Sequence, residues 1–226
     1  MDKVILFGVG QAAKRAYWYL THDSQYEVAA FTVDPAYIKE DKLFGLPVVS
    51  FENIESIYPP SKYKMLLHIN STLPIKVGGL DRLRNKKYYE AKAKGYELIN
   101  YISSQATTWP GLTIGDNCRI LANSTVEPFA RIGNDVTIGV GSMVSHDTVI
   151  KDHCTVIHNA VVLGNVTVEP YCFIGTNATI RSGITIAREC IIGAGALILE
   201  DTVEKGIYKG NPAQLLPIPS DKLKKL

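Results

Sequence analysis

Residues 132–156 read IGNDVTIGVGSMVSHDTVIKDHCTV, and Ile or Val returns at every sixth position of this stretch. The spacing extends outward in both directions, from Ile114 to Ile198, and all fifteen of its positions hold Ile or Val. A helix repeats every 3.6 residues and an ordinary strand every two, so neither accounts for a strict period of six. A triangular coil with three short strands does. We therefore predict a left-handed parallel β-helix of about five coils, with 18 residues in each coil and these aliphatic side chains inside.

A second series, mostly of small residues, lies four places after each of these aliphatics, and Gly, Asn or Asp often stands between the two. These intervening residues tolerate the left-handed backbone that tight corners require. The four cysteines all occupy the small position, at intervals of 36, 18 and 18 residues: Cys118, Cys154, Cys172 and Cys190. One internal column of buried thiols is therefore expected, rather than a disulfide or a metal site.

The residues before the repeat have a different pattern. Apolar runs predict strands at 3–7, 28–33, 65–69 and 98–102, and helices are expected up to Leu20 and over 79–94. Strands that alternate with helices indicate a small parallel sheet of Rossmann type. We therefore expect an α/β domain over 1–105, the β-helix over 106–203, and a tail over 204–226 that contains a short helix.

Composition narrows the class of protein. The chain has 226 residues, 46% of them apolar and 20% charged, and its net charge is +2. This charge excludes a strongly basic nucleic-acid-binding protein. No apolar run approaches the ~20 residues of a membrane helix, and the apolar run at the N-terminus is too short for a secretion signal. A cytoplasmic protein is expected.

The segment Gly8-Val9-Gly10-Gln11-Ala12-Ala13 stands where a phosphate-binding loop belongs, after a strand and before a helix. Its glycines let the backbone approach a pyrophosphate, and the helix N-terminus supplies oriented N–H groups. Asp34, at the end of the second strand, can bond a ribose or a base. A purely structural turn is the alternative. A dehydrogenase is the least expected reading, because no substrate domain follows the loop.

The polar cluster of most interest in the repeat contains His146-Asp147. His146 takes the third position of its hexad, outside the packed interior, and an imidazole beside a carboxylate is a plausible general base. Gly164 follows 18 residues later, hence one coil above, and leaves room and a backbone N–H at the same corner. The alternative is an ordinary surface histidine. His153 and His158 are expected at the surface or in supporting roles.

Three stretches of the chain resemble one enzyme family: the loop from Gly8 to Ala13, His146-Asp147 with the later Leu163-Gly164-Asn165-Val166, and Tyr208-Lys209-Gly210-Asn211-Pro212-Ala213. They are similar to the bacterial hexapeptide acyltransferases of nucleotide-linked amino sugars, such as the bacillosamine-pathway N-acetyltransferases, and to the sialic acid O-acetyltransferases. The resemblance implies a homotrimer that uses acetyl-CoA and no metal to N-acetylate a UDP- or dTDP-linked amino sugar for bacterial surface glycans.

The same resemblance assigns roles at the site of acyl transfer. His146 would take a proton from the attacking sugar amine, Asp147 matches the acidic neighbour that supports it, and the N–H of Gly164 matches the oxyanion donor. In the α/β domain, the resemblance puts the nucleotide on Gly8, Gly10, Gln11, Asp34 and the neighbourhood of Asn70.

For the acyl donor, the resemblance places Thr176 and Ala194 along the pantetheine groove between two subunits, with Lys209 and Gly210 beside them. The chain departs from the family at Thr155, where well-known members carry a second histidine that contacts acetyl-CoA. His158 or His153 is a possible substitute.

Two other functions stay open on the sequence. An O-acetyltransferase of the sialic acid or polysaccharide type would use the same scaffold and the same histidine. A non-catalytic nucleotide-binding trimer would use the β-helix only for assembly. Neither needs a nucleic acid or a membrane as partner.

Overall fold

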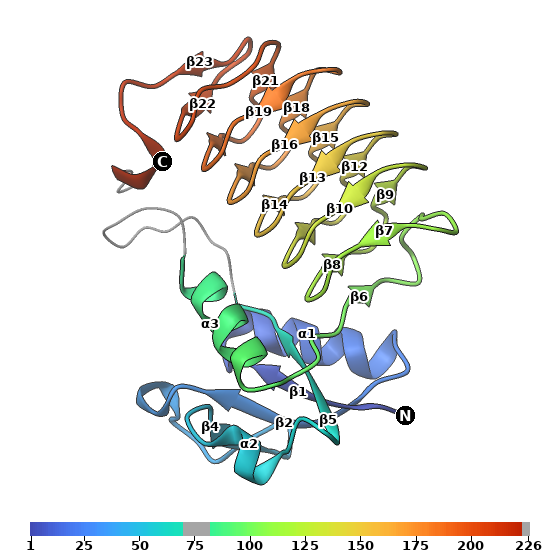
Figure 1. Ribbon diagram of the computed structural model, residues 1–226, viewed down its shortest axis with the longest axis vertical. Helices are drawn as coiled ribbons and strands as arrows, with labels where there is room; N and C mark the ends of the chain where they lie inside the picture. Colours follow the sequence, from blue (N-terminus) through green and yellow to red (C-terminus); the bar gives the residue numbers. More distant parts are fainter. Residues whose placement is uncertain (70–81, 223–226) are drawn as a thin grey trace. The chain divides into compact units, whose positions relative to one another are not determined.

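The computed structural model describes residues 1–69 and 82–222. The chain forms two compact units, one from residues 1–69 and 83–101 and the other from residue 102 onward. Figure 1 shows an α/β unit in blue to green and a solenoid in green to red. No helix among the described residues is long and apolar enough to cross a membrane.

The α/β unit is built on a five-stranded sheet with the strand order β3-β4-β2-β1-β5. Its strands are β1 (Lys3–Phe7), β2 (Glu27–Val33), β3 (Lys42–Leu43), β4 (Leu46–Ser50) and β5 (Tyr63–Leu67). All neighbours pair in parallel except the short edge strand β3, which pairs antiparallel with β4. The sheet confirms the predicted Rossmann-like class, since its parallel strands are joined through helices and loops on its faces.

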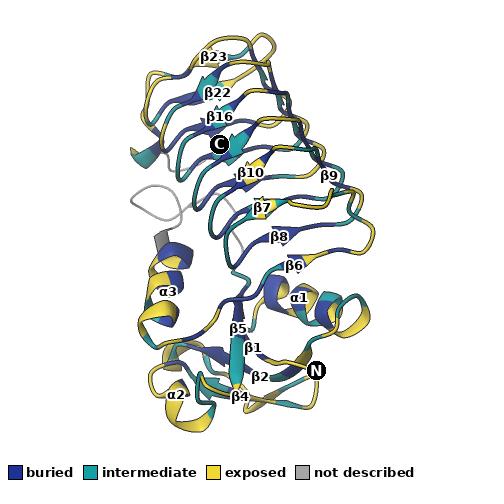
Figure 2. Ribbon diagram, turned by 45° about the vertical axis from the view of Figure 1, so that its right-hand side comes forward, coloured by how far each residue is buried: buried dark blue, intermediate teal, exposed yellow. Residues whose placement is uncertain are grey.

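The described residues of this part of the chain form three helices: α1 (Gln11–His22), α2 (Ile54–Ile57) and α3 (Arg82–Ala93). A 3₁₀ turn, η1 (Pro35–Tyr37), follows β2. One side of α1 is buried through three alanines and Leu20, and Figure 2 shows the opposite side exposed. The small alanines let the helix approach the sheet closely, which fixes its N-terminus beside the end of β1.

The solenoid contains fifteen two-residue strands, each ending on an Ile or Val of the six-residue repeat. They are β7 (Thr113–Ile114), β8 (Arg119–Ile120), β9 (Thr125–Val126), β10 (Arg131–Ile132), β11 (Thr137–Ile138), β12 (Met143–Val144), β13 (Val149–Ile150), β14 (Thr155–Val156), β15 (Val161–Val162), β16 (Thr167–Val168), β17 (Phe173–Ile174), β18 (Thr179–Ile180), β19 (Thr185–Ile186), β20 (Ile191–Ile192) and β21 (Leu197–Ile198). Fourteen of these terminal aliphatics are buried, and Ile114 in the first coil is partly buried.

Every third strand joins the same sheet, so the solenoid has three parallel sheets, as Figure 1 shows. The pairs lie 18 residues apart, as in Ile132 with Ile150 and Val144 with Val162. This register confirms the left-handed parallel β-helix of five coils. Isoleucine and valine suit it, because their branched side chains pack well on a pleated surface and fill the interior.

The corners depend on the fourth residue of each hexad. In fourteen of the fifteen hexads this residue has a positive φ, and eleven of the fourteen are not glycine. Asn and Asp recur there, as at Asn117, Asp147 and Asn165. Their short polar side chains tolerate the left-handed region better than most, which explains why the repeat punctuates its strands with them.

The cysteine column lies inside the solenoid as predicted. All four thiols are buried, and no disulfide forms among the described residues. Burial raises the pKa of the Cys118 thiol to about 12, and it raises the pKa of Cys172 and Cys190 as well. The thiolate is the reactive form of cysteine, so these residues act as small apolar fillers.

Several local predictions were wrong. The expected strand at 98–102 is only an isolated bridge at Leu98 followed by β6 (Tyr101–Ile102). The tail forms two strands that were not predicted, β22 (Ile207–Lys209) and β23 (Gln214–Leu215), before a short 3₁₀ helix, η2 (Ser220–Lys222). The solenoid accounts for the strand β22 in the tail, because β22 pairs with β20 and continues the sheet of the last coil. The predicted helix at 79–94 is observed from Arg82, and residues 79–81 lie outside the described residues.

Candidate active site

His146 and Asp147 follow β12 at a corner of the solenoid. We call this the catalytic corner: residues 145–148 of one coil and 163–166 of the next. Asp147 has a φ of 58°, a left-handed value that turns the chain here. Its carboxylate Oδ2 lies 3.0 Å from His146 Nδ1. Both side chains are about half exposed, at 56% and 52%.

This contact defines the chemistry of the imidazole. A carboxylate accepts hydrogen bonds, so Nδ1 is the ring nitrogen that carries the proton toward Asp147. The neutral ring then presents an unprotonated Nε2, which can accept a proton from a bound molecule. The geometry therefore fits a general base whose orientation is fixed by its neighbour.

Gly164 holds the position directly above His146 in the next coil. A Cβ on Gly164 would lie 2.6 Å from both Cε1 and Nε2 of His146. The N–H of Asn165 donates to the carbonyl of His146 across 3.1 Å, which fixes the stacking of the two corners. The space that sequence analysis reserved for a ligand is thus filled by the imidazole itself. Among the described residues the Gly164 N–H has no acceptor, so it is available as a donor.

Glu127, which the sequence analysis missed, anchors the histidine from the coil below. Its Oε2 accepts a hydrogen bond of 2.8 Å from the backbone N–H of His146. The residue precedes His146 by 19 positions, close to one coil, so the 18-residue repeat carried a signal for it. With Glu127 below and Gly164 above, the backbone and the ring of His146 are both held before any ligand arrives.

The predicted donor-binding residues Thr176 and Ala194 share a different corner, formed by residues 175–178 and 193–196. We call this the donor corner. The carbonyl of Thr176 accepts the N–H of Gly195 across 2.8 Å, and the carbonyl of Gly210 accepts the N–H of Leu197 across 3.1 Å. Thr176, Ala194 and Gly210 are therefore brought together, with Lys209 adjacent in β22.

Within one chain, the donor corner and the catalytic corner belong to different coils and to opposite edges of the same sheet. The catalytic corner follows β12 and β15, and the donor corner precedes β18 and β21, so the two lie along opposite edges of the one sheet that these strands form. Thr155 belongs to neither corner: it is on β14, and only 3% of it is exposed.

The other two repeat histidines differ from each other. His153 is buried, which excludes the surface position but not the supporting role that was its alternative, and its Nδ1 lies 3.0 Å from Asp135 Oδ2. Asp135 also accepts from Arg119 at 3.1 Å, so this network is internal. His158 is exposed, and its Nδ1 accepts the N–H of Val140 across 3.0 Å. Its tautomer is therefore opposite to that of His146, with the proton on Nε2 in the neutral ring.

A cavity of about 560 Å³ opens in the α/β unit at the carboxyl ends of β1 and β2. Gly8, Gly10, Gln11 and Asp34 all line it, so the structure brings these four predicted residues together. Asn70 lies outside the described residues. Gly10 precedes α1 as its N-cap, and the unpaired N–H groups of the first helical turn favour an anion at this end of the cavity.

Gly8 shows why the loop needs glycine. Its φ is +117°, and a Cβ there would lie 3.2 Å from the Cβ of Ala13. A side chain at Gly8 would therefore have to adopt an unfavourable backbone conformation and would crowd the first turn of α1. Glycine lets β1 and α1 approach each other closely at the floor of the cavity.

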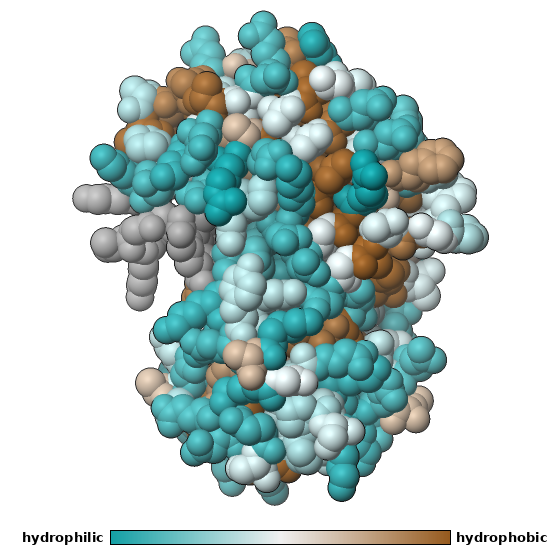
Figure 3. Space-filling view, in the orientation of Figure 1, coloured by the Kyte–Doolittle hydropathy of each residue, from teal (hydrophilic) through white to brown (hydrophobic). Residues whose placement is uncertain are grey.

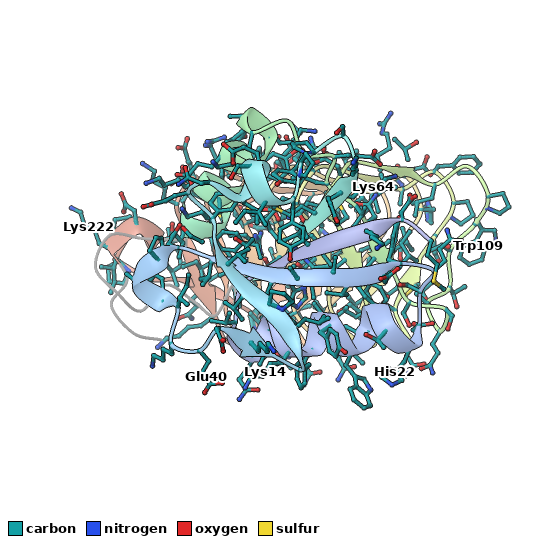
Figure 4. All side chains as sticks on the ribbon, turned by 90° about the horizontal axis from the view of Figure 1, so that it is seen from below. Lys14, His22, Glu40, Lys64, Trp109 and Lys222 are labelled. Atoms are coloured by element: carbon teal, nitrogen blue, oxygen red, sulfur yellow. The ribbon has the colours of Figure 1, made fainter. Side chains whose placement is uncertain are left out.

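Lysines missed by the sequence analysis surround the same cavity: Lys14, Lys39 and Lys42. Figure 4 shows Lys14 and Glu40 on one edge of the unit, and both line the cavity. They come from three separate segments, with Lys14 in α1 and Lys42 in β3, so no periodicity could have selected these three. The cationic lining and the helix N-terminus fit a phosphate-bearing ligand. No cluster of metal-ligating residues occurs in the described part of the chain.

Comparison with known proteins identifies the repeats of the solenoid. The family model of the bacterial transferase hexapeptide, six repeats, matches residues 111–146, 147–182 and 165–200. Residues 111–200 are therefore hexapeptide repeats of the bacterial transferase type. No curated protein sequence matches the chain significantly.

Solved structures show the same two-unit fold along nearly the whole chain. One is an asparagine variant of perosamine N-acetyltransferase from Caulobacter crescentus in complex with CoA and GDP-perosamine: TM-score 0.83, 23% identity, 96% of this chain and 98% of that chain. Another is the acetyltransferase domain of PglB from Neisseria gonorrhoeae in complex with acetyl coenzyme A: TM-score 0.79, 21% identity, 95% and 99% coverage. A third is WeeI from Acinetobacter baumannii: TM-score 0.78, 22% identity, 96% and 100% coverage. The predicted resemblance thus holds at the level of the fold.

Proposed function

We propose that this protein is an acyltransferase that moves an acetyl group from acetyl-CoA to the amine of a nucleotide-linked sugar. The observation that carries the proposal is the catalytic corner: an imidazole oriented by Asp147 through Nδ1, with Nε2 free and the N–H of Gly164 one coil above. The fold supports it, since related solved structures are acetyltransferases described with CoA or acetyl-CoA, one of them also with GDP-perosamine.

In the proposed reaction, His146 Nε2 accepts a proton from the sugar amine as the amine nitrogen attacks the thioester carbonyl carbon. The N–C bond forms, the C–S bond breaks, and the electron pair of that bond leaves with the CoA sulfur. The proton on the imidazolium then passes to the thiolate, so the histidine ends in its starting form. Asp147 stabilises the imidazolium between the two transfers. A positioned base of this kind contributes about 10²–10⁴-fold to the rate.

The Gly164 N–H is the proposed oxyanion donor. It has no acceptor among the described residues and lies at the same corner as the imidazole. One preorganised donor of this kind contributes about 2.7–4 kcal/mol to stabilisation of the transition state.

We further propose that the active form is a homotrimer. The catalytic and donor corners are separated by one sheet in a single chain, so a groove that serves both needs a second copy. The sheet that carries both corners has apolar side chains at outward positions: Met143, Val161 and Leu197 are all partly exposed. Figure 3 shows apolar side chains gathered in a band on the solenoid, between hydrophilic ones. By contrast, exposed Arg131 takes the equivalent position on the neighbouring sheet.

The cavity of the α/β unit is the proposed nucleotide site, with the diphosphate at the N-terminus of α1. The proposed setting is the bacterial cytoplasm, and four free buried thiols agree with a reducing compartment. The proposed product serves bacterial surface glycan synthesis.

A thiol-release assay with acetyl-CoA and a panel of nucleotide sugars tests the proposal. We expect release of CoA only with an amino sugar, since His146 is placed to relieve a nitrogen nucleophile of its proton. Release with hydroxy sugars alone would identify an O-acetyltransferase. No release with any member, from protein shown to bind CoA, would contradict the proposal.

A further inference from the structure

Lys87 is an unusual residue of α3, because its charged end is buried. The helix is rich in charged residues, yet the side chain of Lys87 is only 8% exposed. Its Nζ lies 2.6 Å from Asp34 Oδ1 and 2.7 Å from Glu90 Oε2. It also lies 5.9 Å from the ring centre of Phe7 and 5.2 Å from that of Phe51.

These contacts keep the ammonium charged. Burial alone lowers the pKa of Lys87, but the hydrogen bonds to Asp34 and Glu90 outweigh burial, and the net pKa is raised. Two aromatic faces add cation–π attraction in a site shielded from water. A buried amine is stable only with such partners, so Lys87 is fixed in place rather than free to sample solvent.

Asp34 is the partner that reaches the ligand cavity. Asp34 directly follows β2 and lines the cavity together with Gly8 and Gly10. Its side chain is 29% exposed. Lys87 holds Oδ1 and thereby fixes the rotamer of the carboxylate, while Oδ2 takes no part in that bond. An acidic side chain at this place in a Rossmann-like sheet faces the nucleoside end of a dinucleotide.

We propose that Lys87 is a positioning residue that presents Asp34 as the hydrogen-bond acceptor for the nucleoside part of the sugar nucleotide. The group recognised is an O–H or N–H donor, from either the ribose or the base. Lys87 does not contact the sugar that reacts. The inference rests on the proposed function, because it assumes that the cavity holds a nucleotide.

The test is calorimetric binding of UDP, GDP and dTDP to the full chain and to four variants. Lys87→Met should weaken binding of the preferred nucleotide about 10-fold or more, and Asp34→Asn should do the same. Lys87→Arg should restore part of the affinity, since it keeps the charge. The matched control is Lys86→Met on the same helix: Lys86 is 71% exposed and lies 3.6 Å from Glu90, so its loss should leave binding unchanged.

Steady-state kinetics separate positioning from general damage to the fold. Lys87→Met should raise KM for the nucleotide sugar while kcat and the KM for acetyl-CoA stay near wild type. The double variant Asp34→Asn/Lys87→Met should lose no more affinity than Asp34→Asn alone, because Lys87 acts through Asp34. Two analogues identify the donor: 2′-deoxy-UDP removes a ribose hydroxyl and N3-methyl-UDP removes the N–H of the base.

Three results would overturn the inference. They are an unchanged affinity in Lys87→Met, equal losses in Lys87→Met and Lys86→Met, and additive losses in the double variant. If the wild type binds a nucleoside diphosphate but Lys87 has no effect, only this inference fails. If the wild type binds no nucleoside diphosphate at all, the nucleotide part of the proposed function fails with it.

Discussion

The two units place their candidate sites in opposite ways. In the solenoid, residues 18 positions apart are always neighbours, so His146 and Gly164 meet because of where they stand in the repeat. In the α/β unit, Gly8 and Asp34 meet at one cavity, and Lys87 reaches Asp34, only because a sheet and a helix bring distant segments together. In a repetitive fold, the residues that form a site can be predicted from their spacing in the sequence. In a fold held by contacts between distant segments, some of those residues cannot be predicted in this way.

Within the solenoid, the residues that stabilise the fold are also separate from the residues at the candidate site. The inward columns of the solenoid stabilise every coil in the same way, and the catalytic corner is an exception on the outer side. Substitutions inside should therefore affect folding, and substitutions at that corner should affect activity.

The largest effect is expected inside the solenoid. Ile150 is fully buried and pairs with Ile132 and Val168 on either side. Ile150→Ala should lower the free energy of unfolding by about 2–5 kcal/mol, since it removes buried apolar surface and leaves a cavity. Chemical denaturation measures this loss. Val149→Ala, at the partly exposed position next to it, should lose much less, and equal losses would contradict the assignment of the inward column.

Next in size is the separation of activity from stability at two glycines on successive coils of one corner, Gly164 and Gly183. Gly164→Ala puts a Cβ 2.6 Å from the imidazole of His146, so the ring must move. We expect kcat to fall by about 10²-fold, the lower end of the range for losing a positioned base, with little change in Tm. Gly183 is the control: its φ is +76° and nothing lies within 4 Å of its added Cβ.

Gly183→Ala should therefore show the reverse behaviour, with the unfolding free energy lower by about 1 kcal/mol and kcat unchanged. Activity assays and thermal unfolding of both variants provide the comparison. A Gly164→Ala enzyme with normal kcat would show that the imidazole has room to work elsewhere.

A smaller effect is expected at the α/β cavity. Nothing lies within 4 Å of a Cβ added to Gly10, so Gly10→Ala should fold normally, and its methyl group should occupy the space where a diphosphate approaches. The affinity for UDP should fall by about 10-fold, which corresponds to about 1.4 kcal/mol. Binding of CoA to the same variant is the control, and it should be unchanged. Loss of CoA binding in Gly10→Ala would contradict the separation of the two sites.

The smallest effect concerns alkaline pH. Burial raises the pKa of Cys118 to about 12 in the folded chain, against about 8.5 for an unfolded thiol. The folded state therefore holds this proton where the unfolded state releases it, and stability falls as the pH rises above about 8.5. At pH 9.5 the expected loss from Cys118 is on the order of 1 kcal/mol. Denaturation at pH 7.5 and 9.5 should show a shallower decline in Cys118→Ala, and identical slopes would contradict a buried neutral thiol.

Much of the architecture could be predicted because the period of six leaves few alternatives. The strand positions, the corners, the cysteine column and the stacking of Gly164 on His146 all follow from one repeat. The tail was misjudged, since residues 207–209 form a strand only because the last coil offers an open sheet edge. Sequence could select Gly8, Gly10 and Asp34 from a loop motif. It could not select Lys87, whose role depends on α3 returning to the sheet across 53 residues of sequence.

The most direct test of the account is the kcat of His146→Asn beside that of His158→Asn. His146 is held by Asp147 with Nε2 free, whereas His158 accepts a backbone N–H through Nδ1 and has no acidic partner among the described residues. We predict that His146→Asn lowers kcat by about 10²–10⁴-fold with Tm nearly unchanged, and that His158→Asn keeps most of its activity. Near-normal turnover in a folded His146→Asn enzyme would contradict the account. Inactivity of His158→Asn alone would keep the fold and move the chemistry to the other histidine.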